Sequence, residues 1–184
     1  ITVAMVSART VGMIANRIID KEIDTQNPRT SMRHIPLGIL KVNDFIIPGT
    51  ISCLVLFTCA FLLNPLAFWL SPVAIAYLMF YPYTKRFTWA ANLFLGWALA
   101  IAPSAAWIGV KGTLTWEPFV LSLAVALWAG SFDIIYHCQD IEFQTKNRLH
   151  SIGQKFGIIK AFMMCKILDV GSIICLILLG FIMD

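Results

Sequence analysis

The chain has 184 residues and a formal net charge of +4, with 59% hydrophobic and only 13% charged residues. Its mean hydropathy is +0.78, whereas soluble domains contain roughly 45–50% apolar and about 25% charged residues. This composition excludes an ordinary soluble domain, and the small positive charge gives no sign of nucleic-acid binding. We predict one membrane domain over residues 1–184, with five or six spanning helices of about 20 residues each.

Six apolar segments follow one another along the chain, and most are long enough to cross a bilayer. They cover residues 1–19, 45–63, 66–81, 89–110, 118–136 and 158–182. Because lipid offers no partner for unpaired backbone groups and no alternating strand pattern is present, we predict an all-α transmembrane bundle. Asn64 and Pro65 leave room only for a tight turn, so the second and third segments are predicted to be antiparallel neighbours.

Basic residues concentrate in three stretches, and two apolar segments separate each stretch from the next. Ten of the 14 Lys and Arg residues lie there: Lys21, Arg29, Arg33, Lys41, Lys85, Arg86, Lys146, Arg148, Lys155 and Lys160. Two crossings return the chain to the same face of the membrane, so the three stretches share one face. The positive-inside rule predicts that this face is cytoplasmic.

Three oxygen-bearing side chains occur at the end of the first apolar segment. Asn16, Asp20 and Asp24 are spaced by four and four residues. A continuous α-helix would place all three on one face. Glu22 lies two residues beyond Asp20, on the opposite side of such a helix, and is a weaker candidate.

A similar set occurs at the end of the fifth apolar segment. Asp133, Tyr136 and Asp140 follow one another at intervals of three and four residues, which again favours one helical face. Glu142 is off that face in the same way as Glu22. The chain therefore carries two acidic helix ends, which indicates weakly that its two halves are related.

Carboxylate and amide oxygens are ligands that Mg²⁺ prefers, often together with the phosphates of a substrate. Four aspartates that face one cleft would repel one another unless cations lay among them. We therefore predict that the two acidic sets bind divalent metal. Lys85 and Arg86 begin a basic loop on the same side and are predicted to bind the outer oxygens of a diphosphate. A solvated helix end is the ordinary alternative for either acidic set alone.

These motifs resemble those of the UbiA superfamily of intramembrane prenyltransferases, in particular its 4-hydroxybenzoate polyprenyltransferase branch. NRIIDKEID at residues 16–24 is similar to the family's NDxxDxxxD motif, and the following NPRTSMRHIPLG to its RTxxRPxPxG continuation. YPYTKRFT at residues 81–88 resembles the YxxxKR segment. DIIYHCQDIEF at residues 133–143, followed by LHSI at residues 149–152, resembles the second motif, DxxYxxxD, and its loop.

The resemblance implies a fold and an activity. The fold would be a UbiA-like bundle of about nine helices, so one helix before Ile1 and about two after Asp184 are expected outside this chain. The activity would be Mg²⁺-dependent transfer of a polyprenyl group from polyprenyl diphosphate to an aromatic acid such as 4-hydroxybenzoate, in ubiquinone or menaquinone biosynthesis. Such an enzyme would lie in the inner membrane of a bacterium, with its active site facing the cytoplasm.

The resemblance also implies roles for individual residues. One Mg²⁺ is assigned to Asn16, Asp20 and Asp24, and a second to Asp133 and Asp140. The predicted catalytic residues are Asp20, Asp24, Asp133, Asp140 and Tyr136, and the predicted substrate-binding residues are Lys85, Arg86, Tyr81, Arg29 and Arg33. The tyrosines would stabilise an allylic cation through their rings, whereas positive-inside charge explains Arg29 and Arg33 at least as well as substrate binding.

Some positions depart from the family pattern. Gln144 stands where many members have another Asp, so the second site has one carboxylate fewer beside Asp140. Arg17 replaces the Asp that often follows the first Asn, and His34 occupies a usual Pro position. Metal stoichiometry at the second site depends on how Gln144 is used.

Other polar residues are expected to lie outside the site. His137 and His150 have no partner at metal-ligand spacing and are predicted to be surface or packing residues. Asp169 lies inside the last apolar segment, where an ionisable group normally marks function. Lys166 is one helical turn away, and we expect the two to form an ion pair.

Three other functions are compatible with parts of this pattern. A dihydroxynaphthoate of a menaquinone route is an alternative acceptor, because DIIYHCQDIEF and LHS resemble both kinds of enzyme. A transporter would also contain buried acids, but transport sites usually lie near the membrane midplane rather than at helix ends. A membrane alcohol phosphotransferase is disfavoured because the chain lacks a DGxxAR run.

Overall fold

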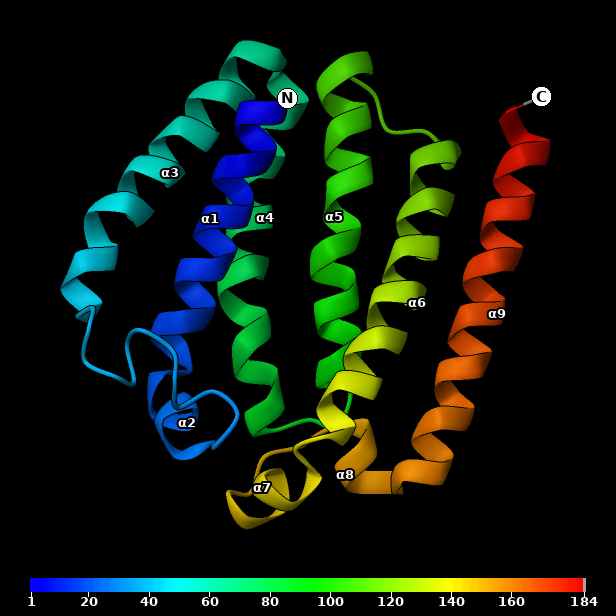
Figure 1. Cartoon of the computed structure of the whole chain (residues 1–184). Coiled ribbons are helices and arrows are strands. Elements are labelled where there is room, and N and C mark those ends of the chain that lie inside the picture. The colour runs from blue at the N-terminus through cyan, green and yellow to red at the C-terminus, as the bar shows by residue number, and fades with distance from the viewer. Residues whose placement is uncertain (184) are drawn as a thin grey trace. The chain divides into compact units, whose positions relative to one another are not determined.

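The computed structural model describes residues 1–183, which form nine α-helices, one 3₁₀-helix and no strand within that range. The all-α prediction is confirmed. The elements, in chain order (Figure 1), are α1 (Thr2–Ile19), α2 (Lys21–Gln26), α3 (Val42–Leu63), α4 (Pro65–Phe80), η1 (Tyr81–Arg86), α5 (Ala91–Lys111), α6 (Trp116–Cys138), α7 (Ile141–Lys146), α8 (Ile152–Phe156) and α9 (Ile158–Met183).

Five helices are long and apolar enough to cross a membrane among residues 1–183. They correspond to α3, to α4 with η1, and to α5, α6 and α9. The segment over residues 1–19 forms α1 as predicted, but α1 is not among these five because Arg9, Arg17 and several hydroxyl side chains lower its hydropathy. The protein is an integral membrane protein with at least these five candidate spans.

The chain divides into two compact units, and the first, Ile1–Pro82, is built from α1, α3 and α4. α1 packs against both of the other long helices (Figure 1). Its core contains Val11, Leu56 and Ile75, one from each helix. The predicted tight turn is confirmed: the Asn64 side chain accepts a hydrogen bond from Ala67 N at 2.9 Å, which caps α4 and makes α3 and α4 antiparallel neighbours.

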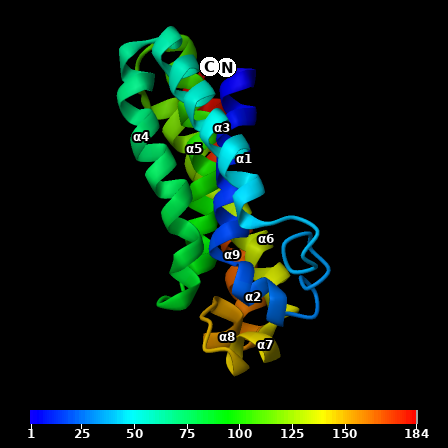
Figure 2. The ribbon, with the colours of Figure 1, turned by 90° about the vertical axis from the view of Figure 1, so that its left-hand side faces the viewer.

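The second unit, Tyr83–Asp184, is built around α6, which packs against α5 on one side and α9 on the other. Small residues allow α5 and α6 to approach closely. A Cβ atom on Gly96 of α5 would overlap the carbonyl oxygen of Ala126 on α6. α7 and α8 lie together at one end of this unit (Figure 2). Ile152 of α8 is fully buried there in a core with Ile134 and Cys165.

Both acidic motifs contain a helix break, at the middle residue Asp20 in the first and at the last residue Asp140 in the second. Asp20 separates α1 from α2 with φ −96° and ψ 6°. Asp140 separates α6 from α7 with φ −111° and ψ 17°. A continuous helix through each motif was expected from the spacing, and this prediction is wrong at these two residues. Each break is followed by a helix of 6 residues.

Candidate functional site

The first acidic helix end, which comprises Asn16, Asp20 and Asp24, keeps its two carboxylates inside the protein. Asp20 is 2% exposed and Asp24 is 5% exposed. Arg33 Nη1 donates to Asp24 Oδ2 at 2.6 Å, and Arg17 Nη1 lies 4.0 Å from the same oxygen. A buried carboxylate requires such compensation. The structure thus brings Arg33, a predicted substrate-binding residue, onto a predicted metal ligand.

Two further contacts stabilise this end. Asn16 Nδ2 donates to the Tyr81 hydroxyl at 3.5 Å, a weak hydrogen bond that joins two predicted site residues. Thr30 Oγ1 donates to the Asp24 carbonyl oxygen at 3.1 Å. Arg29 contributes its backbone N–H to Asn27 Oδ1 at 2.9 Å, and its side chain is exposed.

Arg17 lies in the last turn of α1, outside the five candidate spans. Burial, and next the positive charge of Arg33, lower the pKa of Arg17, while the carboxylate of Asp24 raises it. Two guanidinium groups therefore face one carboxylate at this end.

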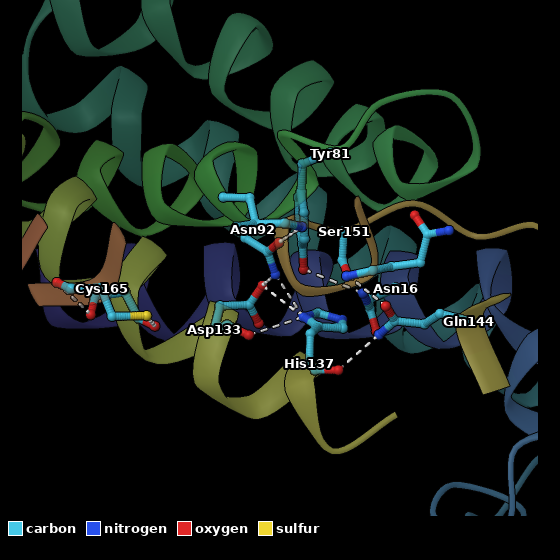
Figure 3. A network of polar contacts seen from close by, with 11 residues as sticks. Asn16, Tyr81, Asn92, Asp133, His137, Gln144, Ser151 and Cys165 are labelled. Carbon is cyan, nitrogen blue, oxygen red and sulfur yellow. Dashed lines mark hydrogen bonds and ion pairs between the residues drawn. The ribbon is translucent and has the colours of Figure 1, made fainter. Parts of the chain in front are cut away.

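The second acidic helix end, which comprises Asp133, Tyr136 and Asp140, has a different set of partners (Figure 3). Asn92 Nδ2 donates to Asp133 Oδ2 at 2.8 Å. His137 Nδ1 lies 3.0 Å from the same oxygen and 2.9 Å from Asn92 Nδ2. Asp133 is 5% exposed and Asp140 is 9% exposed, whereas Tyr136 is half-exposed. The two carboxylates are therefore buried, whereas the tyrosine ring is accessible.

Gln144 replaces a carboxylate in this motif, and its side chain is buried. Gln144 Nε2 donates to the His137 carbonyl oxygen at 3.1 Å, and Gln144 Oε1 accepts from Ser151 Oγ at 2.5 Å. Ser151 Oγ also accepts from Gln154 N and so caps α8. Gln144 therefore connects the end of α6 to the start of α8 (Figure 3).

The basic loop is connected to the same unit. The Lys85 carbonyl oxygen accepts a hydrogen bond from His150 N at 2.7 Å. The Arg86 guanidinium carbon lies 5.1 Å from the centre of the Tyr83 ring, which is a cation–π distance. Lys85 is half-buried and Arg86 is exposed.

Sequence reasoning missed Asn92 and misjudged His137. His137 is not a simple surface or packing residue, because it contacts Asp133, and their spacing of four residues on one helix was an available signal. Asn92 was visible as an amide inside an apolar segment. The expected ion pair between Lys166 and Asp169 is absent from residues 1–183, because Asp169 has no cation within salt-bridge distance there.

The family model described as "UbiA prenyltransferase family" matches residues 1–183. The chain belongs to the UbiA prenyltransferase family. This confirms the resemblance that the motifs indicated.

Relatives of this UbiA chain agree with the assignment. It is 32% identical over 183 residues to a 4-hydroxybenzoate octaprenyltransferase of Francisella tularensis subsp. novicida, covering 100% of this chain and 64% of the relative. It is 30% identical over 149 residues to the enzyme of that name from Vibrio cholerae serotype O1, covering 81% of this chain and 52% of the relative. The chain thus spans less than two thirds of the length of these proteins.

A solved structure supports the fold. The UbiA chain superposes on the apo structure of a UbiA homolog from Aeropyrum pernix K1 with a TM-score of 0.89 and 29% identity, over 94% of this chain and 66% of that one. A digeranylgeranylglyceryl phosphate synthase, 20% identical, matches with a TM-score of 0.71 over 94% of this chain and 61% of that one, and shows the same fold.

The buried oxygen atoms at the two acidic ends of this UbiA chain are of the type that binds a divalent cation. Each acidic end contains two buried carboxylates, and hard oxygen donors of this type suit Mg²⁺. No group of three or more His, Cys, Asp or Glu side chains is gathered for a metal among the described residues. A cation at the first end would therefore need further oxygens from Asn16 or a substrate phosphate, and one at the second end would need oxygens from a substrate phosphate.

Proposed function

We propose that the protein to which this chain belongs transfers a polyprenyl group from polyprenyl diphosphate to an aromatic acid such as 4-hydroxybenzoate, in ubiquinone or menaquinone biosynthesis. Membership of the UbiA prenyltransferase family supports the reaction class. The printed names of the Francisella and Vibrio relatives favour 4-hydroxybenzoate as acceptor. The observation that carries the proposal is the pair of helix ends that each bury two carboxylates.

The proposed site uses the residues that the sequence singled out. Asn16, Asp20 and Asp24 would hold one Mg²⁺, and Asp133 with Asp140 would hold a second. When bound, these ions neutralise the charge of the departing diphosphate. Asp133 retains one oxygen for this role, because both side-chain contacts described for it fall on Oδ2.

The remaining residues bind and position the substrates. Lys85 and Arg86 contact the outer diphosphate oxygens, and Arg29 and Arg33 contribute positive charge for the diphosphate or the acceptor carboxylate. The carbon–oxygen bond to diphosphate breaks to leave an allylic cation, which the π faces of Tyr81 and Tyr136 stabilise. A ring carbon of the acceptor then forms the new carbon–carbon bond and loses its proton.

Orientation in the membrane is part of the same proposal. The positive-inside rule supports a cytoplasmic position for the acidic ends, because the basic stretches lie beside them. The bacterial relatives favour the inner membrane of a bacterium. A substrate diphosphate made in the cytoplasm would then reach the site directly.

The test uses the full-length protein in membranes, assayed with polyprenyl diphosphate and either 4-hydroxybenzoate or a dihydroxynaphthoate. We expect prenylation of 4-hydroxybenzoate that chelation of Mg²⁺ abolishes, and losses of roughly 100-fold or more in Asp20→Asn and Asp140→Asn. The matched controls are Glu22→Gln and Glu142→Gln, which change exposed acids on the same short helices.

Three results would contradict parts of this proposal. Transfer that survives chelation and both Asp→Asn changes would exclude the metal assignment. Prenylation of the naphthoate alone would change the acceptor. Solute uptake into vesicles without any prenyl transfer would favour a transporter.

A further inference from the structure

Asn92 is a fully buried amide near the start of α5, an apolar helix that is one of the five candidate spans. A buried amide costs free energy unless its donors and acceptor are bonded. In a membrane helix, an internal polar side chain therefore indicates a specific contact. Asn92 has three such contacts, and each joins it to another part of the second unit.

The orientation of the Asn92 amide is determined by its partners. Its Oδ1 accepts from Ile152 N at 3.1 Å, and its Nδ2 donates to Asp133 Oδ2 at 2.8 Å (Figure 3). A backbone N–H can only donate, and an ionised carboxylate can only accept. Both partners require the same orientation, so a flipped amide would lose two hydrogen bonds at once.

Asn92 and His137 both contact the same oxygen of Asp133. Asn92 Nδ2 and His137 Nδ1 lie 2.8 and 3.0 Å from Oδ2. Within residues 1–183 no hydrogen bond reaches the other oxygen, Oδ1. Fixing one oxygen restricts rotation of the carboxylate and presents the other in a defined direction, which is how outer partners orient metal ligands.

Asn92 also joins Asp133 to the segment that follows the second motif. Ile152 N belongs to the first turn of α8, and the Ile152 side chain is fully buried. Ser151, the preceding residue, binds the Gln144 side chain. One amide therefore bridges α5, α6 and α8 at the base of Asp133.

We propose that Asn92 is a positioning residue for Asp133: it directs Oδ1 of Asp133 toward a divalent cation and fixes this direction to the start of α8. This inference rests on the proposed function in that it assumes a cation at Asp133. It adds a role for a residue outside both acidic motifs.

The test compares three variants of the full-length protein. Asn92→Leu and Asn92→Ala lose the same hydrogen bonds but differ in packing. Ser104→Ala is the matched control, because Ser104 Oγ contacts Ser122 Oγ at 2.7 Å and so joins the same two helices, α5 and α6, without touching Asp133. Each purified variant is titrated with Mn²⁺ by electron paramagnetic resonance, with and without pyrophosphate, and its thermal unfolding is recorded.

The expected result is a 10–100-fold weaker Mn²⁺ affinity in both Asn92 variants, as is typical for loss of a partner that orients a metal ligand. Ser104→Ala should bind Mn²⁺ like the unmodified protein. In transfer assays, the Mg²⁺ concentration for half-maximal rate should rise in the Asn92 variants while KM for the aromatic acid stays constant. If Asn92→Leu does not fold, Asn92→Ala carries the comparison.

A double variant separates positioning from packing. Because Asn92 acts through Asp133, Asn92→Ala combined with Asp133→Asn should bind Mn²⁺ no more weakly than Asp133→Asn alone. Additive losses would overturn the proposal, as would Asn92 variants that unfold at lower temperature but keep the Mn²⁺ affinity of the Ser104→Ala control. Failure of the proposed function would appear differently, as absence of Mg²⁺-dependent transfer in the unmodified protein, and the Mn²⁺ titration would still decide the role of Asn92.

Discussion

At the first acidic helix end, Asp24 lies four residues after the break at Asp20 and binds the guanidinium of Arg33. At the second, Gln144 lies four residues after the break at Asp140 and binds the hydroxyl of Ser151. At both ends a helix break is therefore followed by a buried polar side chain, which makes a charged contact at the first end and a neutral contact at the second.

The two ends compensate in different ways for the burial of a polar side chain. A buried carboxylate needs a cation or several donors, whereas a buried amide is neutral and pairs with one acceptor at its nitrogen and one donor at its oxygen without any opposite charge. Gln144 has both, the His137 carbonyl and the Ser151 hydroxyl. The buried acids of the second end are thus Asp133 and Asp140, and Gln144, which departs from the family pattern, connects two parts of the fold.

The largest expected effect concerns Asp24. Asp24→Asn should lower prenyl transfer roughly 100-fold or more, because it removes a proposed metal ligand and leaves Arg33 without its carboxylate. Initial rates in membranes measure this loss, and Glu22→Gln on the same helix should keep the rate of the unmodified protein. A rate within threefold of normal for Asp24→Asn would show that the charged contact is structural only.

The second end depends on close approach of two long helices, and Gly96 tests this dependence. Gly96→Ala should lower the free energy of unfolding by about 1–3 kcal/mol, because the new methyl group overlaps the Ala126 carbonyl oxygen. Thermal exposure of the buried thiols Cys165 and Cys175 to a thiol-reactive dye measures the change. Gly180→Ala is the control, since a Cβ atom there meets nothing within 4 Å.

Gln144→Asp restores the carboxylate that many family members have, and so tests the neutral contact directly. We expect a loss of about 1–3 kcal/mol in stability, because the shorter acidic side chain cannot donate to the His137 carbonyl and buries a charge. The Mg²⁺ concentration for half-maximal transfer should not fall. A lower Mg²⁺ requirement would contradict the structural role of Gln144, and Thr145→Ala on the same helix is the control.

The smallest effects concern the hydroxyl groups that support each end. Ser151→Ala should cost about 1 kcal/mol, because it removes both the cap of α8 and the donor to Gln144. Thr30→Val should cost less, about 0.5 kcal/mol, because it loses only the hydrogen bond to the Asp24 carbonyl. Thermal unfolding of both variants in one detergent gives the comparison, and a larger loss in Thr30→Val would reverse it.

The spanning segments could be predicted from sequence because bilayer thickness imposes a length on every apolar run. The four aspartates were singled out by their spacing, and the structure buries all four; their role as metal ligands stays a prediction. The helix breaks at Asp20 and Asp140 could not be predicted, because a change in the backbone angle ψ at one residue leaves no mark on the spacing of polar and apolar residues. Prediction by helical phase therefore failed at Asp20, within the first motif, and at Asp140, the last residue of the second.

The contact between Asn92 and Asp133 could not be predicted from the sequence for a different reason. Asn92 lies 41 residues before Asp133 in the chain, and they meet only because α5 and α6 pack closely. That approach depends on the absence of a side chain at Gly96. A pattern within one segment carries no information about a contact between two segments. The contact between Asp133 and His137 lies within one helix, so their spacing of four residues could have predicted it.

The contact between the Lys85 carbonyl and the His150 N–H involves no side chain. Any residue except proline can supply that N–H. Position 150 can therefore change in evolution without displacing the Lys85 backbone, and the sequence of this loop can diverge among related chains while the basic residue keeps its place. Tolerance of substitution at this position would then reflect a backbone contact rather than lack of importance.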